Sequence, residues 1–93
     1  MGSLLATYRV NDYGTFKAEF DEFAWTRKEL GATGHRLMRA PDNPGIVAVV
    51  IDFSSLDAAR RFAADPGRLD VLDRAGVIER TDLILQDMDT EVY

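Results

Sequence analysis

The sequence contains no cysteine, and this absence excludes disulfide bonds, thiolate metal sites and cysteine nucleophiles. A lack of disulfides is typical of the reducing cytoplasm, so we expect a cytoplasmic protein. The apolar runs are far shorter than the ~20 residues that a membrane-spanning helix needs. No basic segment precedes Leu4, as one would in a signal peptide. The sequence therefore predicts neither a membrane span nor a secretion signal.

Basic residues are also few. The chain has 11 Lys and Arg against 16 Asp and Glu, which gives a formal net charge of −5 at pH 7. Phosphate backbones are bound by a stripe of positive charge. The small group formed by Arg27, Lys28, Arg36 and Arg39 does not reverse the overall sign. We do not expect a nucleic-acid partner.

Recognisable site motifs are missing as well. His35 is the only histidine, and the chain has no Gly-rich phosphate loop, no Ser-His-Asp spacing and no His/Asp cluster. We therefore expect neither a metal nor an organic cofactor. Hydrophobic residues make up 46% of the chain, and no low-complexity tract interrupts them. Residues 1–93 are expected to form one folded domain.

The segment Ile46–Phe53 is apolar at nearly every position. A strand with one buried face alternates apolar and polar residues, whereas a strand that is apolar in both phases is covered on both sides. The chain has room for only about two long helices, which cover one face of a small sheet. We therefore predict a homodimer in which a second copy covers the open sheet face.

The remaining pattern predicts the order β-α-β-β-α-β. Strands are expected at residues 4–10, 34–40, 46–53 and 82–88. Helices are expected at residues 13–30 and 54–64, with a short further piece at 68–75. Two right-handed crossovers on one sheet give a ferredoxin-like α+β fold, a four-stranded antiparallel sheet with the first and third strands central. The more polar strand 34–40 suits an edge.

Cap signals mark the ends of these helices. Asp12 is a plausible N-cap of the first helix, and Gly31 is placed to end it in the left-handed conformation. Ser54, with Asp57 three residues later, resembles a capping box for the second helix. Gly76 is expected to end the short helical piece before the last strand.

The first helix carries an aromatic stripe with one charged member. Phe16, Phe20, Phe23 and Arg27 fall on the same face at about 100° per residue. Arg27 either binds a carboxylate or enolate in a pocket between helix and sheet, or complements the helix dipole and pairs with an acid. Trp25 lies on the opposite side, where it is an oligomer contact, the lip of a cleft or simple surface packing.

As a whole, the chain is similar to the dimeric α+β barrel proteins, and within these it most resembles the antibiotic-biosynthesis-monooxygenase-like and cyclase-like branch. The resemblance is carried by the aromatic first helix, the Gly34-His35-Arg36 strand start, the Pro/Asn/Gly hairpin at 41–45 and the segment Phe53–Ala59. It implies two sheets packed face to face as a barrel, helices outside, and a small-ligand pocket within each subunit. Members include cofactor-free oxygenases of aromatic polyketides, haem-degrading enzymes, decarboxylases and isomerases.

The resemblance and the residue types together suggest a site. His35 would act as a base or orienter and Arg27 as an anion holder, while Tyr8 could hydrogen-bond a polar ligand. The expected apolar wall consists of Phe20, Met38 and Phe53. The alternatives are a partly exposed strand histidine bonded to neighbouring backbone, and a core tyrosine.

Two functions remain open from the sequence. One is an enzyme that acts without a cofactor on an aromatic or polyketide-like molecule, as an oxygenase, cyclase or isomerase. The other is a non-catalytic binding or structural module of the same fold, whose interior is filled by side chains. The three phenylalanines favour the module, and the lone Arg and His favour the enzyme. An enclosed pocket of roughly 300 Å³ or more that contains Arg27 or His35 would support the enzyme.

Overall fold

A computed structural model describes residues 1–93. Its strands are β1 (Gly2–Val10), β2 (Ala32–Arg39), β3 (Ile46–Phe53) and β4 (Val77–Gln86). Its helices are α1 (Tyr13–Glu22), α2 (Ala24–Glu29), α3 (Leu56–Ala63) and α4 (Pro66–Arg74). No helix combines the length and the apolar character needed to cross a membrane.

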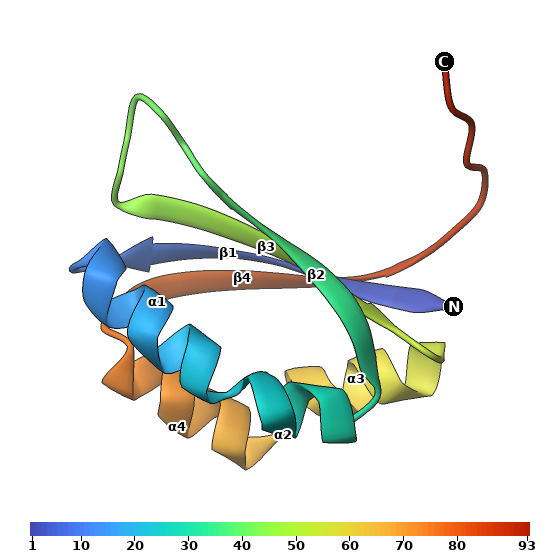
Figure 1. Ribbon diagram of the computed structural model, residues 1–93, viewed down its shortest axis with the longest axis horizontal. Helices are drawn as coiled ribbons and strands as arrows, with labels where there is room; N and C mark the ends of the chain where they lie inside the picture. The colour runs from blue at the N-terminus through green and yellow to red at the C-terminus, as the bar shows by residue number, and fades with distance from the viewer.

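The sheet has the strand order β2-β3-β1-β4, and every neighbouring pair is antiparallel. β1 and β3 are central, while β2 lies at an edge, as the polar character of its sequence predicts. All four helices lie on the same face of the sheet (Figure 1). This arrangement confirms the predicted ferredoxin-like α+β fold.

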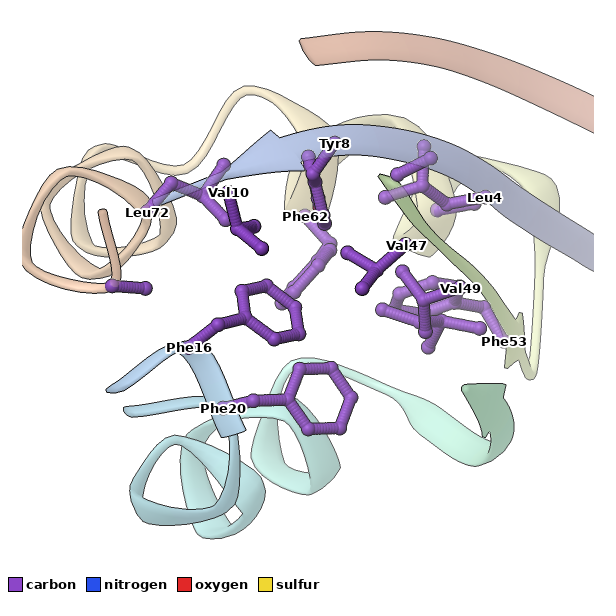
Figure 2. Packing of buried hydrophobic residues seen from close by; sticks show 14 of the residues in the cluster. Leu4, Tyr8, Val10, Phe16, Phe20, Val47, Val49, Phe53, Phe62 and Leu72 are labelled. Carbon is purple, nitrogen blue, oxygen red and sulfur yellow. The ribbon is translucent and has the colours of Figure 1, made fainter. Parts of the chain in front are cut away.

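The core lies between the helices and one face of the two central strands. Alternate residues of β1 and β3 point into it, namely Leu4, Ala6, Tyr8, Val10, Val47, Val49, Ile51 and Phe53. Figure 2 shows Phe16 and Phe20 reaching from α1 toward this layer. Burying each large apolar side chain contributes about 1.5–3 kcal/mol, so these aromatic residues anchor α1 to the sheet.

The predicted helix 13–30 is in fact two helices, separated at Phe23. Asp12 caps the first one as predicted, since its carboxylate accepts a hydrogen bond from Thr15 N–H. The ring of Phe23 packs against Phe62 of α3, with the centroids 6.2 Å apart. The bend therefore directs the Phe23 side chain toward α3. This tertiary contact outweighs the local preference for a continuous helix.

The other elements are close to the prediction, but their bounds differ in places. β1 begins at Gly2 and not at Leu4, and β2 is Ala32–Arg39 and not residues 34–40. The N-cap of α3 is Ser55 and not Ser54, because the Ser55 hydroxyl accepts from Ala58 N–H at 3.1 Å. α4 begins at Pro66 and not at residue 68, with Asp65 as its cap and proline in the first turn, where its missing N–H costs nothing. β4 begins at Val77 and not at Asp82, and it ends at Gln86 and not at Met88.

Two glycines end helical segments with positive φ. Gly31 has φ 104° and Gly76 has φ 78°, a region that residues with a Cβ avoid. Both were expected as helix terminators, and both are followed within a residue by a strand.

The other sheet face carries no helix and is called the open face below. Leu5 lies at its centre, paired with Val50 on one side and Leu83 on the other. Leu83 is 57% exposed in the single protomer. Polar pairs flank this centre, since Ser3 donates to Asp52 at 2.7 Å. The sheet therefore has a second apolar surface, as the pattern of Ile46–Phe53 predicts.

Candidate functional site

A small cavity lies between the helical layer and the sheet. It measures about 20 Å³, room for about one water molecule. Nine of its eleven lining residues are hydrophobic; the full lining is Tyr8, Phe16, Phe20, Phe23, Arg27, Ile51, Phe62, Arg68, Val71, Leu72 and Ala75. The phenylalanine rings fill most of the interior, and the volume is far below the roughly 300 Å³ of a typical ligand pocket.

Arg27 is buried and lines this cavity. Arg27 is 5% exposed, and its guanidinium carbon lies 3.8 Å from the centre of the Phe20 ring. Nη1 donates to the Phe20 carbonyl oxygen at 2.6 Å. None of the ion pairs in the structure includes Arg27. Burial lowers the pKa of Arg27, and the charge of Asp21 opposes this only in part.

His35 lies on the outer side of the same aromatic wall. It stands opposite Ile51 in the β2–β3 register, so it points to the helix side of the sheet. Its ring meets the Phe20 ring edge-on, with centroids 5.0 Å apart. Partial burial lowers the pKa of His35, and the positive charges of Arg27 and Lys17 lower it further. The imidazole is therefore neutral near pH 7, the form that accepts a proton.

An open cleft of about 460 Å³ runs between α2 and β2. Its lining contains cationic and small residues and no acid: Ala24, Arg27, Lys28, Ala32, Thr33, Gly34, His35 and Ile51. The structure thus brings the two predicted catalytic residues, Arg27 and His35, into one cleft. Arg27 and Ile51 also line the inner cavity, so the two volumes share a wall.

A second buried arginine, which was not predicted from the sequence, lines the same cavity. Arg68 of α4 is 2% exposed. Its guanidinium donates to both carboxylate oxygens of Asp82 at 2.8 and 3.1 Å. It also donates to the Tyr8 hydroxyl at 2.9 Å and to the Ala63 carbonyl at 2.8 Å. Arg68 therefore ties α3, α4, β1 and β4 together.

The charges within this network are mutually stabilised. Burial alone would raise the pKa of Asp82, but hydrogen bonds and charge from Arg68, helped by Arg80, hold it below its usual value. Burial likewise opposes the charge on Arg68, yet Asp82 and Tyr8 outweigh it and raise the pKa of Arg68. Burial raises the pKa of Tyr8, which stays protonated. Because Tyr8 accepts from Arg68, its own O–H remains available to a group in the cavity.

A signal for the buried position of Arg68 was present in the sequence. Arg68, Val71, Leu72 and Ala75 recur at the helical spacing of a buried face. Arg27 holds the corresponding position on the aromatic face of the first helix. Asp82 pairs with Ala6 in the register and therefore faces the core side. No cluster of three His, Cys, Asp or Glu side chains suited to a metal ion occurs.

The other predicted residues are divided between the two sides of the sheet. Tyr8 and Phe20 line the cavity. Phe53 is buried, but it packs on Phe62 at 5.2 Å and does not line the cavity. Met38 pairs with Ala48 and lies on the open face, so its expected place on the cavity wall is wrong. Trp25 points outward as predicted and is 70% exposed.

Comparisons with known proteins reveal the fold and no closer relationship. No protein-family model matches the chain, and no curated protein matches it significantly. Among solved structures it is similar to SnoaB, a cofactor-independent oxygenase from Streptomyces nogalater. The two share 20% identity over 96% of this chain and 94% of that one, with a TM-score of 0.80.

Two further structures give the same picture. A candidate antibiotic biosynthesis monooxygenase from Bordetella bronchiseptica shares 18% identity over 94% of this chain and 96% of that one, with a TM-score of 0.74. An antibiotic biosynthesis monooxygenase shares 17% identity over 96% and 100%, with a TM-score of 0.71. The chain therefore has the α+β fold of antibiotic-biosynthesis-monooxygenase-like proteins, as its sequence resemblance predicted.

Proposed function

We propose that this protein is a cofactor-free monooxygenase that acts on a small aromatic molecule held between the helical layer and the sheet. The observation that carries the proposal is the pair of buried guanidinium groups, Arg27 and Arg68, at a cavity otherwise lined by aromatic and aliphatic side chains. The likeness to SnoaB, which is named a cofactor-independent oxygenase, supports the same chemistry.

Such a reaction needs an electron-rich substrate anion. Neutral His35 would take the proton of a phenol, and Arg27 would stabilise the phenolate. The phenolate passes one electron to dioxygen, the two radicals combine into a peroxide, and its O–O bond breaks as water leaves. A phenol and one dioxygen thus give one quinone and one water. The Tyr8 O–H, held by Arg68, is placed to donate to the peroxide oxygen.

The test uses 1,5-dihydroxynaphthalene, whose oxidation by one dioxygen gives the coloured quinone juglone and one water. Dioxygen uptake and quinone absorbance are measured together, with and without the protein. We expect one dioxygen per quinone at a rate well above the uncatalysed one. Arg27→Gln and His35→Ala should lose most of this rate, and Arg61→Gln, which changes an exposed arginine of α3, should keep it. A wild-type rate equal to the uncatalysed rate contradicts the proposal.

The same assay separates the related reactions. A cyclase or isomerase would use the same substrate anion without dioxygen, so it would consume substrate with no dioxygen uptake.

The second candidate is a non-catalytic binding or structural module. The observation that favours it is the volume of the cavity, about 20 Å³, because Phe16, Phe20 and Phe23 occupy the space that a ligand would need. Under this alternative, neither the wild type nor a Phe20→Ala variant with an enlarged cavity would turn over any phenol.

We also propose that the protein works as a homodimer joined through the open face, and that it resides in the cytoplasm. Leu5, Val50 and Leu83 form an apolar centre that no helix of the same chain covers. Leu85 extends this surface and is 42% exposed. Apolar strand faces of this kind are normally covered in the assembled protein. The absence of cysteine supports the cytoplasmic location.

A further inference from the structure

The wall between the inner cavity and the outer cleft consists of very few side chains. Arg27 and Ile51 line both volumes. The Phe20 ring lines the cavity and contacts Arg27 on its face and His35 on its edge. Displacement of Phe20 from Arg27 would therefore join the cavity to the cleft.

Arg27 has an unusual set of contacts for a buried cation. Its one hydrogen bond goes to a neutral carbonyl, and that carbonyl belongs to the same Phe20 whose ring it covers. Asp21, the acid whose charge raises the pKa of Arg27, is already paired with Lys17 at 2.7 Å. Buried charges are normally paired with an opposite charge. The guanidinium is thus held in place by a single residue and lacks an anion.

The cleft side of Arg27 suits an anion. Lys28 and His35 stand beside it, Thr33 adds a hydroxyl, and no Asp or Glu lines the cleft. A carboxylate presents two oxygens that match the fork of a guanidinium, and such charge-assisted pairs are stronger than a bond to a neutral carbonyl. A carboxylate that arrives through the cleft can therefore replace Phe20 as the partner of Arg27.

The backbone allows the two residues to separate. Phe20 belongs to α1 and Arg27 to α2, and the chain bends between them at Phe23. α2 has only 6 residues, and no side chain caps its N-terminus. Short, weakly capped helices are the segments that shift at low cost.

We propose that Phe20 and Arg27 form a door between the cleft and the cavity, and that the ligand which opens it is a planar aromatic carboxylic acid. The carboxylate binds Arg27 from the cleft, and the ring enters the space that Phe20 vacates among the apolar side chains. This inference rests on the proposed small-molecule site, and it makes a phenol that also carries a carboxylate the preferred substrate.

Binding of two matched probes tests the proposal. 1-Naphthoate and the neutral 1-naphthalenemethanol share one ring system and differ in charge. We expect wild-type protein to bind naphthoate at least about tenfold more tightly in calorimetry at pH 7.5. Arg27→Gln should reduce this preference to within about threefold, whereas Arg61→Gln should leave it unchanged. Equal affinity of the wild type for both probes, or a tenfold preference kept by Arg27→Gln, overturns the proposal.

A measurement on the unaltered protein covers the case in which Arg27→Gln does not fold. In the NMR spectrum of the wild type, saturating naphthoate should shift the Arg27 Nε–H resonance and the Phe20 ring resonances together. An unchanged Arg27 resonance at saturation overturns the door. Phe20→Leu, which shortens the side chain, should speed association of naphthoate while keeping its preference over the alcohol.

The outcomes also separate this inference from the proposed oxygenation. Selective binding of naphthoate without turnover of any carboxylated phenol would support the door and contradict the oxygenase activity. Turnover of 1,5-dihydroxynaphthalene with no preference for naphthoate would support the oxygenase activity and contradict the door.

Discussion

Removal of the Asp82 carboxylate should destabilise this protein more than any surface change. Asp82→Ala leaves the Arg68 guanidinium, 2% exposed, without its counter-charge. Breaking a buried ion pair from one side costs about 3–5 kcal/mol. The Asp82 side chain is 20% exposed, and Arg68 keeps its bonds to Tyr8 and Ala63. We therefore expect the lower end, about 3 kcal/mol of unfolding free energy.

Thermal and urea unfolding at fixed protein concentration measure this loss. A domain of this size loses about 4–8 °C of Tm per kcal/mol, so Asp82→Ala should lower Tm by about 12–24 °C. The control is Asp57→Ala, which breaks a pair with Arg60 across the surface of α3, where the Asp57 side chain is 81% exposed. It should change the stability little, because exposed pairs are weak.

A double-mutant cycle isolates the pair itself. Arg68→Met keeps an apolar stem in place of the guanidinium, so the double variant Arg68→Met/Asp82→Ala leaves no buried charge behind. We expect the double variant to be no less stable than Asp82→Ala alone, so the coupling energy should be at least as large as the loss that Arg68→Met causes by itself. A loss below about 1 kcal/mol for Asp82→Ala, or two single losses that simply add, would show that the Arg68–Asp82 pair does not stabilise the fold.

Three further predictions concern pH, the open face and a helix end. The folded state holds the pKa of Asp82 below its ordinary 3.8. The stability that ionised Asp82 contributes is therefore complete above about pH 4 and is lost as pH falls through the folded pKa. Acid titration should bring the wild type and Asp82→Asn to equal stability, and a constant difference down to pH 2 would contradict this. Val50→Asp, at the centre of the open face, should convert a dimer into a monomer in sedimentation at micromolar concentration; a wild type that is itself monomeric there would disprove the interface. Gly31→Ala, at φ 104° and with its new Cβ 3.1 Å from Ala58, should lower the free energy of unfolding in urea by about 1–2 kcal/mol. Gly34→Ala, whose Cβ meets nothing within 4 Å, should not lower it. Equal losses for the two variants would rule out backbone strain at Gly31.

The sequence was sufficient for the topology because each strand and helix carries its own local pattern. Ile46–Phe53 is β3 with the predicted bounds. The aromatic spacing of the first helix put Phe16, Phe20 and Arg27 on one buried face, as observed. Asp12 and Gly31 marked the ends of this region because capping depends on one side chain or on one backbone angle.

The break at Phe23 was not predictable from local pattern. Neither proline nor glycine stands there, and the bend follows from packing of Phe23 on Phe62, far away in the sequence. The start of β4 was hidden for a similar reason. Residues 77–81, which include the charged Glu79 and Arg80, were not predicted as strand, yet they pair with β1, since an edge strand tolerates charged side chains.

The candidate site could be found only in part. Arg27 and His35 were identified by residue type. They line the same cleft because α2 and β2, which carry them, follow each other in the chain. Met38 was misplaced, although strand parity excludes it, because residues an odd number of positions from His35 on one strand point to the other face. The Arg68–Asp82 pair joins α4 to β4 through tertiary packing, and no short sequence motif predicts such a contact.

A crystal structure of the wild-type protein grown with 1-naphthoate is the most direct test of the ligand site. We expect the naphthalene ring between the helical layer and the sheet, the carboxylate on Arg27, and Phe20 turned away from the guanidinium. Naphthoate bound elsewhere, with the contact between Arg27 and Phe20 intact, would contradict the claim that this layer is the ligand site.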